Sequence, residues 1–382
     1  MTARQRATPP LLRNLNERTV LDAIREGAPI SRAEISRRSG ISKPTVSLAL
    51  QSLLEAQLVR EATERPDGPG YGAVYFEPVP DAALVLGLDV GARFVRGAVC
   101  DLAGTIRARQ DVELPVAAVP DAVAAIERLR SSLFAASGLD PDRFDGVVVG
   151  VPGVVESATG VLRLAENVAG LEGRAFADEL QNALDLPVTL ENDINLAALG
   201  EQWQGVAQGV DDFVFLSIGT GMGAGLVLRG ELHRGRHGAA GEIDFALVGV
   251  DQRLDPSAPE IAQLASRFAA RQADARAVFG AARNGDENAR AVVGEIARRI
   301  ALHLAPIASV ADVELVVLGG GIGANGDLLL DPIGRLLQEW LPFPPRLEVS
   351  TLGDAAVLTG ALAVGLQAAL ENVFAKRPSL TA

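Results

Sequence analysis

Residues 29–56 read PISRAEISRRSGISKPTVSLALQSLLEA, and this stretch decides the fold of the N-terminal part of the chain. Ser31 is a suitable N-cap for a short helix, and Glu34 three residues later completes a capping box. Gly40 then provides a turn, because glycine adopts a positive φ at little cost. Ser42 caps the helix that follows. This order of caps and turn predicts a helix-turn-helix.

The flanking residues extend this motif to a winged helix-turn-helix. Apolar residues recur at helical spacing over residues 12–25, which predicts another helix ahead of the motif. Residues 58–61 and 73–76 have the composition of two strands, and the turn-rich residues 65–70 between them form the expected wing. The alternative is a plain three-helix bundle that binds a protein or nothing.

The third helix is expected to be the one that enters the major groove of DNA. Its core-facing apolar positions are expected to be Val46, Leu48, Leu50, Leu53 and Leu54. Small hydroxyls and one cation lie on the other side of its start, and such groups suit contacts to phosphates and base edges. The candidate DNA-binding residues are Ser42, Lys43, Thr45 and Ser47, together with Arg65 of the wing.

Charge is distributed unevenly along the chain. The net charge is −13, which by itself argues against a nucleic-acid partner. Residues 1–65 nevertheless hold 11 Lys and Arg against 7 Asp and Glu, whereas the remaining residues hold 24 against 41. A basic head on an acidic body is typical of a DNA-binding module attached to a sensor. Ordinary scatter of surface charge is the alternative interpretation.

Cysteine usage and hydropathy indicate a cytoplasmic protein with no membrane partner. Cys100 is the only cysteine, which excludes a disulfide within the chain and a zinc site built from several cysteines. No apolar segment follows the first arginines as a secretory signal requires. The most apolar run, residues 355–370, contains two glycines and is interpreted as a buried helix rather than a membrane span.

Four stretches after residue 84 repeat one pattern, a buried strand that ends in a glycine turn. They are residues 84–91 (LVLGLDVG), 147–153 (VVVGVPG), 213–225 (FVFLSIGTGMGAG) and 315–323 (LVVLGGGIG). Duplicated strand-rich units with helices between them predict an α/β body with the two-lobed, ribonuclease H-like fold of actin and hexokinase. In such a fold glycine turns line the cleft, because backbone N–H groups can approach phosphates closely there.

The chain resembles the ROK family (repressors, open reading frames and kinases) from end to end. The most specific match is residues 191–201, ENDINLAALGE, which follow the family pattern ENDxNxAALGE. Further matches are the turn beginning at Ser217 and residues 238–243 (GAAGEI), 281–286 (AARNGD) and 319–321 (GGG). The resemblance implies a winged helix-turn-helix over residues 1–80, a first lobe over 84–193 and 358–376, and a second lobe over 194–357.

The resemblance also implies a sugar site. In the kinases of this family the aspartate at the position of Asp193 acts as a base toward a sugar hydroxyl, and Asn192 would hold the same hydroxyls. Glu242 resembles a further sugar ligand. Carboxylates and amides suit sugars because they pair with vicinal hydroxyls. The expected ligand-binding residues are therefore Asn192, Asp193 and Glu242. Asn192 and Asp193 also fit a helix N-cap, and both roles can coexist.

The chain departs from the kinase pattern in ways that argue against catalysis. The phosphate turn Asp-x-Gly-Gly-Thr of the kinases has Ala92 and Arg93 in its last two positions here, which takes away the small groups that admit phosphate. We therefore expect no catalytic residue, with Asp193 as a vestigial base, and no cofactor. The family's Gly-Glu-Ile-Gly-His segment ends in Phe245, which is expected either to stack on a ligand or, more readily, to fill the space that a metal would leave.

The family's zinc site is expected to be absent. Its cysteine cluster is missing, because residues 249–259 hold Asp, Gln and Pro instead. The three histidines of the chain, His233, His237 and His303, are scattered and without cysteine partners. They are interpreted as surface or core residues rather than metal ligands.

These observations predict a DNA-binding transcriptional repressor whose zinc-free ROK body senses a sugar or sugar derivative. The expected partners are double-stranded operator DNA, the small-molecule effector, and further copies of the chain in a homodimer or homotetramer. One alternative is a sugar kinase that transfers phosphate from ATP to a hexose and also carries a DNA-binding head. The other alternative is a regulator whose body no longer senses a small molecule and only dimerises or docks a protein.

Overall fold

The structure is a computed structural model of the whole chain. The residues that it describes are 9–63, 73–114, 119–140, 143–165, 168, 170–248, 254–271 and 274–375. The tip of the expected wing, including Arg65, lies outside the described residues.

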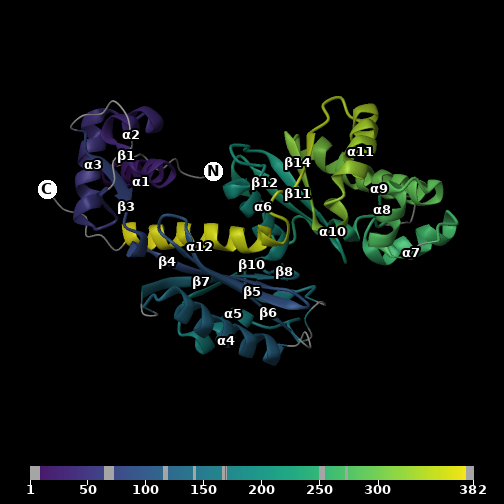
Figure 1. The fold of residues 1–382 in the computed structure, drawn as a ribbon, viewed down its shortest axis with the longest axis horizontal. Coiled ribbons are helices and arrows are strands. Elements are labelled where there is room, and N and C mark those ends of the chain that lie inside the picture. The colour runs from purple at the N-terminus through teal and green to yellow at the C-terminus, as the bar shows by residue number, and fades with distance from the viewer. Residues whose placement is uncertain are drawn as a thin grey trace.

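The N-terminal head combines three helices with a small antiparallel sheet (Figure 1). Its elements are α1 (Pro9–Gly27), β1 (Ile30–Ser31), α2 (Arg32–Ser39), α3 (Lys43–Glu55), β2 (Val59–Glu61) and β3 (Tyr75–Pro78). Strand β3 pairs with both β1 and β2. The hydroxyl of Ser31 accepts a hydrogen bond from the Glu34 N–H at 3.3 Å, and that of Ser42 accepts one from the Thr45 N–H at 3.4 Å. The caps and the winged fold are confirmed, and the plain three-helix bundle is excluded.

Two details of the head differ from the sequence expectations. Leu48 was expected to face the core, but it is 70 % exposed, whereas Val46 and Leu50 are buried. The prediction failed because the sequence shows that a residue is apolar but does not show whether its side chain points toward the core or toward solvent. The capping box is also incomplete, because the Glu34 side chain does not bond back to the N-cap. Its carboxylate instead accepts hydrogen bonds from the side chains of Arg37 and Arg38 in the same helix.

The first lobe of the body is a five-stranded sheet covered by helices on both faces. Its strands are β4 (Leu84–Val90), β5 (Phe94–Asp101), β6 (Ile106–Glu113), β7 (Phe144–Val151) and β10 (Val188–Asn192), in the order β10-β7-β4-β5-β6. The first three strands are antiparallel, and β7 and β10 run parallel to β4. The helices α4 (Val119–Ser137) and α5 (Phe176–Leu184) pack on one face and α12 (Ala356–Ala375) on the other (Figure 1).

Strand β4 shows why this sheet needs cover on both sides. Because successive side chains of a strand point to opposite faces, Leu84, Leu86 and Leu88 join the core beneath α4 and α5, while Val85 joins the core beneath α12. The short element η1 (Pro80–Ala82) connects the head to this lobe. The lobe also contains the paired short strands β8 (Val154–Val155) and β9 (Leu162–Arg163).

The second lobe repeats the strand order of the first. Its strands are β11 (Phe213–Ile218), β12 (Met222–Leu228), β13 (Glu231–Leu232), β14 (Leu315–Gly319) and β15 (Arg346–Val349), in the order β13-β12-β11-β14-β15. Its helices are α6 (Asp193–Gln204), η3 (Ile243–Phe245), α7 (Ala258–Arg267), α8 (Ala275–Arg283), α9 (Glu287–Ala311), α10 (Gly320–Gly323), α11 (Gly326–Trp340) and η4 (Gly353–Ala355). Helices α9 and α11 cover one face and α6 the other. The duplicated two-lobed α/β fold is therefore confirmed.

The head and the first lobe share one hydrophobic core. Val20 and Leu21 of α1 belong to the same cluster of buried side chains as Leu366 and Phe374 of α12. At the edge of this contact the guanidinium of Arg25 donates a hydrogen bond to the Leu102 carbonyl at 2.8 Å. The head is thus seated on α12, which runs between it and the sheet (Figure 1).

Helix α12 makes up most of the one stretch of the described residues that is long and apolar enough to cross a membrane, Gly353–Phe374. In the structure 56 % of its apolar 18-residue window is buried. Its side chains pack against the sheet of the first lobe and against the head. The expectation that residues 355–370 form a buried helix is confirmed.

Candidate DNA-binding helix and effector cleft

The start of α3 presents four of the five expected DNA-binding residues. Ser42 and Lys43 are exposed, and Thr45 and Ser47 are partly exposed. The hydroxyls are engaged locally: those of Ser42 and Thr45 lie 2.9 Å apart, and that of Ser47 donates to the Lys43 carbonyl at 2.9 Å. Each hydroxyl oxygen can still accept a further hydrogen bond. The ammonium of Lys43 supplies the positive charge of this helix start.

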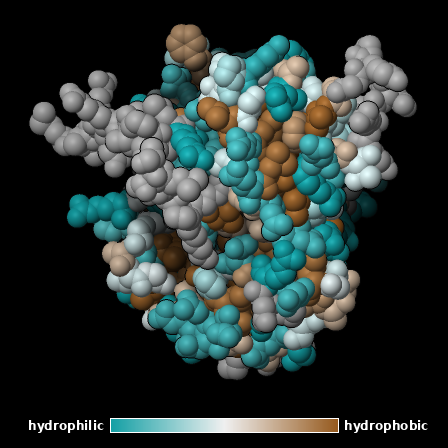
Figure 2. All heavy atoms as spheres, turned by 90° about the vertical axis from the view of Figure 1, so that its left-hand side faces the viewer, coloured by the Kyte–Doolittle hydropathy of each residue, from teal (hydrophilic) through white to brown (hydrophobic). Residues whose placement is uncertain are grey.

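Helix α2 adds positive charge beside α3. Arg32, Arg37 and Arg38 are all exposed. Hydrogen bonds from Arg37 and Arg38 hold the pKa of Glu34 at about 2, so this carboxylate stays ionised and offsets one of the cations. The surface that includes the head is mostly hydrophilic, with hydrophobic side chains scattered over it (Figure 2).

The junction of β10 and α6 carries the expected sugar-binding residues. Asn192 is the N-cap of α6: its side-chain oxygen accepts from the Asn195 N–H at 2.9 Å, and its amide donates to the Gly153 carbonyl at 2.8 Å. The capping role of Asn192 is therefore realised. One amide hydrogen and one lone pair of Asn192 stay available, so a ligand contact is compatible with the cap.

Asp193, the first residue of α6, lies in a cluster of carboxylates. Desolvation raises its pKa to about 7, and the negative charges of Asp89 and Glu242 add to this rise. Desolvation also raises the pKa of Glu242, and the charge of Asp244 raises it further. The structure thus brings Asp193 and Glu242 together, with Asp89 from the end of β4 as a third carboxylate.

Sequence reasoning missed a network that holds this junction. Glu191 is buried at 7 % exposure, and one of its oxygens accepts from the Asn192 N–H and from the Asn195 side chain, each at 2.9 Å. Its other oxygen accepts from Arg234 at 2.6 Å. Because Arg234 follows β13 in the second lobe and Glu191 lies in β10 of the first, this ion pair links the lobes. The ENDxN pattern contained the signal for Glu191 and Asn195, but nothing in it pointed to Arg234.

The hairpin between β4 and β5 takes the place of the kinase phosphate turn. Ala92 and Arg93 are exposed at its tip. Behind the tip, Arg96 donates a hydrogen bond to Asp89 at 3.0 Å. Burial nevertheless raises the pKa of Asp89, because desolvation outweighs the attraction of the guanidinium. The positive charge next to Asp89 is thus the guanidinium of Arg96.

The hairpin between β11 and β12 has a more open tip. The Gly219 N–H donates to the Gly221 carbonyl at 2.9 Å, which closes the turn. A Cβ atom added at Gly219 would meet only the Gly321 nitrogen, at 3.8 Å, and one added at Gly221 would meet nothing within 4 Å. The backbone that follows β11 therefore faces the backbone of α10 without intervening side chains.

The described residues around the expected zinc segment do not fit a zinc ion, and residues 249–253 of that segment lie outside the described residues. Phe245 occupies the histidine position, and Cys100 lies buried in β5, where desolvation raises the pKa of its thiol to about 12. Among the described residues no three His, Cys, Asp or Glu side chains are grouped as metal ligands would be. Phe245 is 48 % exposed, so the expectation that it fills an interior space is wrong. His303 is buried in α9, as expected for a core histidine.

These features define a class of protein: a winged-helix DNA-binding head joined to an actin-like, two-lobed sugar-kinase fold. The chain belongs to the ROK family, whose model matches residues 85–368, and a MarR family model matches residues 13–68. The MarR match falls within the head and ends before β3, and the ROK match falls within the body.

Three relatives place the chain within the family. The xylose repressor of Caldicellulosiruptor bescii is 24 % identical over 385 residues, which cover 93 % of this chain and 96 % of that protein. A glucokinase of Halalkalibacterium halodurans is 32 % identical over 248 residues, covering 56 % of this chain and 74 % of the enzyme. A crystal structure of a ROK family transcriptional regulator, a homologue of the E. coli MLC protein, matches with a TM-score of 0.77 and 24 % identity, covering 95 % and 98 % of the two chains.

Proposed function

We propose that this protein is a transcriptional repressor that responds to a sugar or sugar derivative bound between its two lobes. The observation that carries the proposal is the joining of a winged-helix head, through a shared core, to a two-lobed body with a cluster of carboxylates at the start of α6. The full-length match to a xylose repressor supports it, whereas the glucokinase match covers 56 % of the chain.

The first experiment is fluorescence anisotropy of the full-length protein with DNA from upstream of its own gene and its neighbours. A scrambled duplex at the same salt concentration is the control. Binding to one genomic duplex tighter than to the control by at least about a thousandfold supports the regulator. Equal, weak binding to every duplex contradicts it.

We infer that Asp193 and Glu242, with the remaining hydrogen-bonding capacity of Asn192, bind the hydroxyls of the effector. An Asp193→Ala variant is expected to keep its DNA affinity, since Asp193 lies outside the head, and to lose the release of DNA by sugars. The measurement is the same anisotropy titration over a panel of pentoses and hexoses. An unchanged sugar response would overturn this site, and a wild-type protein without any ligand-induced melting shift would favour a body that no longer senses a small molecule.

The effector signal is proposed to reach the head through two crossed helices. Helix α6 starts at Asp193 and packs against β12 of the second lobe, while α12 packs against the first lobe and the head. The two helices approach closely: a Cβ atom added at Gly360 would lie 1.8 Å from the Leu196 carbonyl oxygen. Because the backbones touch, a change in the angle between the lobes displaces α12 beneath the head.

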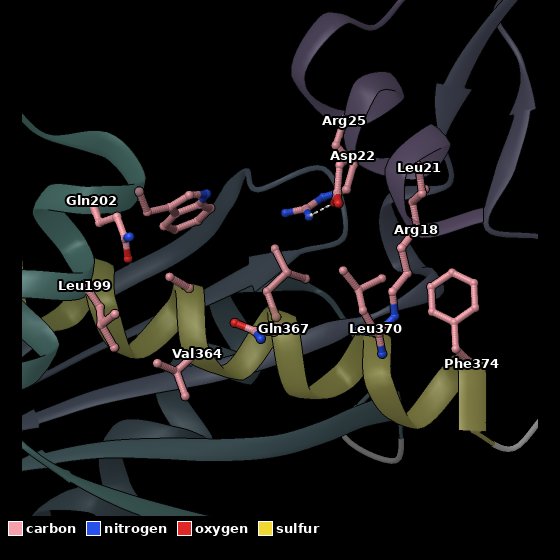
Figure 3. Close-up of a pocket in the computed structure, with 13 residues that line it drawn as sticks. Arg18, Leu21, Asp22, Arg25, Leu199, Gln202, Val364, Gln367, Leu370 and Phe374 are labelled. Atoms are coloured by element: carbon pink, nitrogen blue, oxygen red, sulfur yellow. Dashed lines mark hydrogen bonds and ion pairs between the residues drawn. The ribbon is translucent and has the colours of Figure 1, made fainter. Parts of the chain in front are cut away.

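A hollow beside α12 leaves space for such a displacement (Figure 3). It measures about 420 Å³ and lies between α1 of the head and α6 of the body. Arg18 and Leu21 of the head and Leu199 and Gln202 of α6 are among the residues that line it (Figure 3). In a homodimer or homotetramer, movement of each head would change the distance between two recognition helices relative to half-sites about one DNA turn apart.

Sugar kinase activity is the second candidate function, and one observation favours it. A carboxyl group with a pKa of about 7, such as that of Asp193, suits general-base catalysis. The exposed Ala92 and Arg93 and the pairing of Asp89 with Arg96 argue against a phosphate site on the first hairpin, so we propose that the protein is not an enzyme. Sugar-dependent ADP release in a coupled assay would overturn this conclusion.

A further inference from the structure

The outer face of α3 has an apolar side chain at its centre. Leu48 is 70 % exposed, although Val46, Leu50 and Leu53 of the same helix are buried. Each residue of an α-helix turns by about 100°, so Leu48 projects on the side of α3 opposite to its buried face. Packing within the head therefore does not account for a leucine at this position.

The neighbours of Leu48 on this face are also exposed. Pro44 lies about one turn before it and Gln51 about one turn after it. The Gln51 amide donates to the Glu55 carboxylate at 3.0 Å. The face therefore consists of a proline, a leucine at its centre and an amide that already has a partner, and Lys43 lies beside it at the helix start.

Polar groups near Leu48 give this face few hydrogen-bond donors. The proton of the Ser47 hydroxyl is used in the bond to the Lys43 carbonyl, and one of the two hydroxyl protons of Ser42 and Thr45 is used in the bond between them. Most sequence reading in the major groove uses donors and acceptors, but the thymine 5-methyl group is read by apolar contact. Among the described residues of α3, Leu48 is the one large hydrophobic side chain that is exposed, and it suits that contact.

We propose that Leu48 contacts the 5-methyl group of a thymine in the major groove and makes one base-pair position of each half-site specific for thymine. The inference rests on the proposed DNA-binding function and deepens it by naming the base. A surface leucine alone would need no explanation. Leu48 differs because it is central on the face of a helix that a winged helix-turn-helix inserts into the groove.

The test uses duplexes selected by the full-length protein from a random DNA library. In the selected duplex each thymine is replaced in turn by deoxyuridine, which removes only the methyl group. At one thymine of each half-site, the replacement is expected to weaken binding of the wild type by about fourfold, the value for one buried methyl group. Leu48→Ala is expected to bind the thymine and deoxyuridine duplexes equally.

Leu15→Ala is the matched control. Leu15 is another exposed leucine of the head, at 59 %, but it lies on α1. This variant is expected to keep the wild-type discrimination between thymine and deoxyuridine, and both variants are expected to keep the wild-type melting temperature because the side chains are exposed.

The outcomes separate this inference from the proposed function. A protein that selects no sequence would overturn the regulator, and the role of Leu48 with it. A protein that selects a sequence but binds all deoxyuridine duplexes as well as the parent, or whose Leu48→Ala variant keeps the discrimination, would overturn only the role of Leu48.

Discussion

The two lobes have the same strand order, but their first hairpins have different tips. The hairpin of the first lobe carries the exposed Ala92 and Arg93 and an internal ion pair between Asp89 and Arg96. That of the second lobe carries a glycine turn with open space around Gly221. The strands must stay alike because each sheet packs helices on both faces, whereas the tips contribute nothing to either core. The residues at the tip of a hairpin can therefore change in one lobe without destabilising the fold that both lobes share.

The largest effect is expected where the lobes meet, at the crossing of α6 and α12. Gly360→Ala would place a Cβ atom 1.8 Å from the Leu196 carbonyl oxygen and 3.0 Å from the Gly200 nitrogen. Since backbone on both helices would have to move, the free energy of unfolding should fall by about 3 kcal/mol. Urea unfolding measures it.

Gly294→Ala in α9 is the control for this crossing. Its added Cβ would meet nothing within 4 Å. The free energy of unfolding should therefore rise by about 0.5–1 kcal/mol, as for glycine replacement within a helix. Equal effects of the two substitutions would show that the lobes are not held by close contact at Gly360.

An intermediate effect is expected at the first hairpin. Arg96→Ala leaves the buried carboxylate of Asp89 without its nearest cation, and unfolding should become easier by about 2 kcal/mol. Arg93→Ala, at the exposed tip of the same hairpin, should stay within about 0.5 kcal/mol of the wild type. Thermal unfolding distinguishes the two. If Arg93→Ala lowered the stability and Arg96→Ala did not, our assignment of which arginine is structural would be reversed.

The smallest effect is expected at the start of α6 and depends on pH. The pKa of Asp193 is raised to about 7 in the folded protein from 3.8, so the folded state holds a proton that the unfolded state has lost between these values. Stability contributed by this group is present below pH 4 and is lost as the pH rises toward 7. Asp193→Asn should therefore be more stable than the wild type at pH 8, by about 1 kcal/mol after allowance for partial exposure.

Melting curves at pH 4 and pH 8 test this prediction. The Asn variant and the wild type should melt together at pH 4, because the wild-type carboxyl group is then protonated in the folded state. A constant difference between them at both pH values would show that Asp193 does not titrate in this range.

Local rules predicted much of the molecule from its sequence. Ser31 and Ser42 cap helices as expected because capping depends only on residues within one turn. The strand-and-glycine pattern predicted the two lobes because a buried strand needs a continuous apolar run. Leu48 was placed wrongly because apolar spacing does not reveal which side of a helix meets the core.

Contacts between distant residues could not be predicted. The ion pair of Asp89 with Arg96 depends on the register of β4 against β5, and the pair of Glu191 with Arg234 depends on how the lobes meet. The resemblance supplied Asp193 and Glu242, but their raised pKa values follow from burial and from the charges of neighbouring carboxylates, which need coordinates.

The core shared by α1 and the end of α12 has a consequence for how this head can be reused. Leu366 and Phe374 lie almost three hundred residues after the last strand of the head, yet they complete its interior. A gene fragment that ends after residue 80 would encode a head with part of its apolar surface open to water. A chimera that moves this specificity to another sensor must therefore carry the C-terminal half of α12 as well, so the transferable unit is discontinuous in the gene.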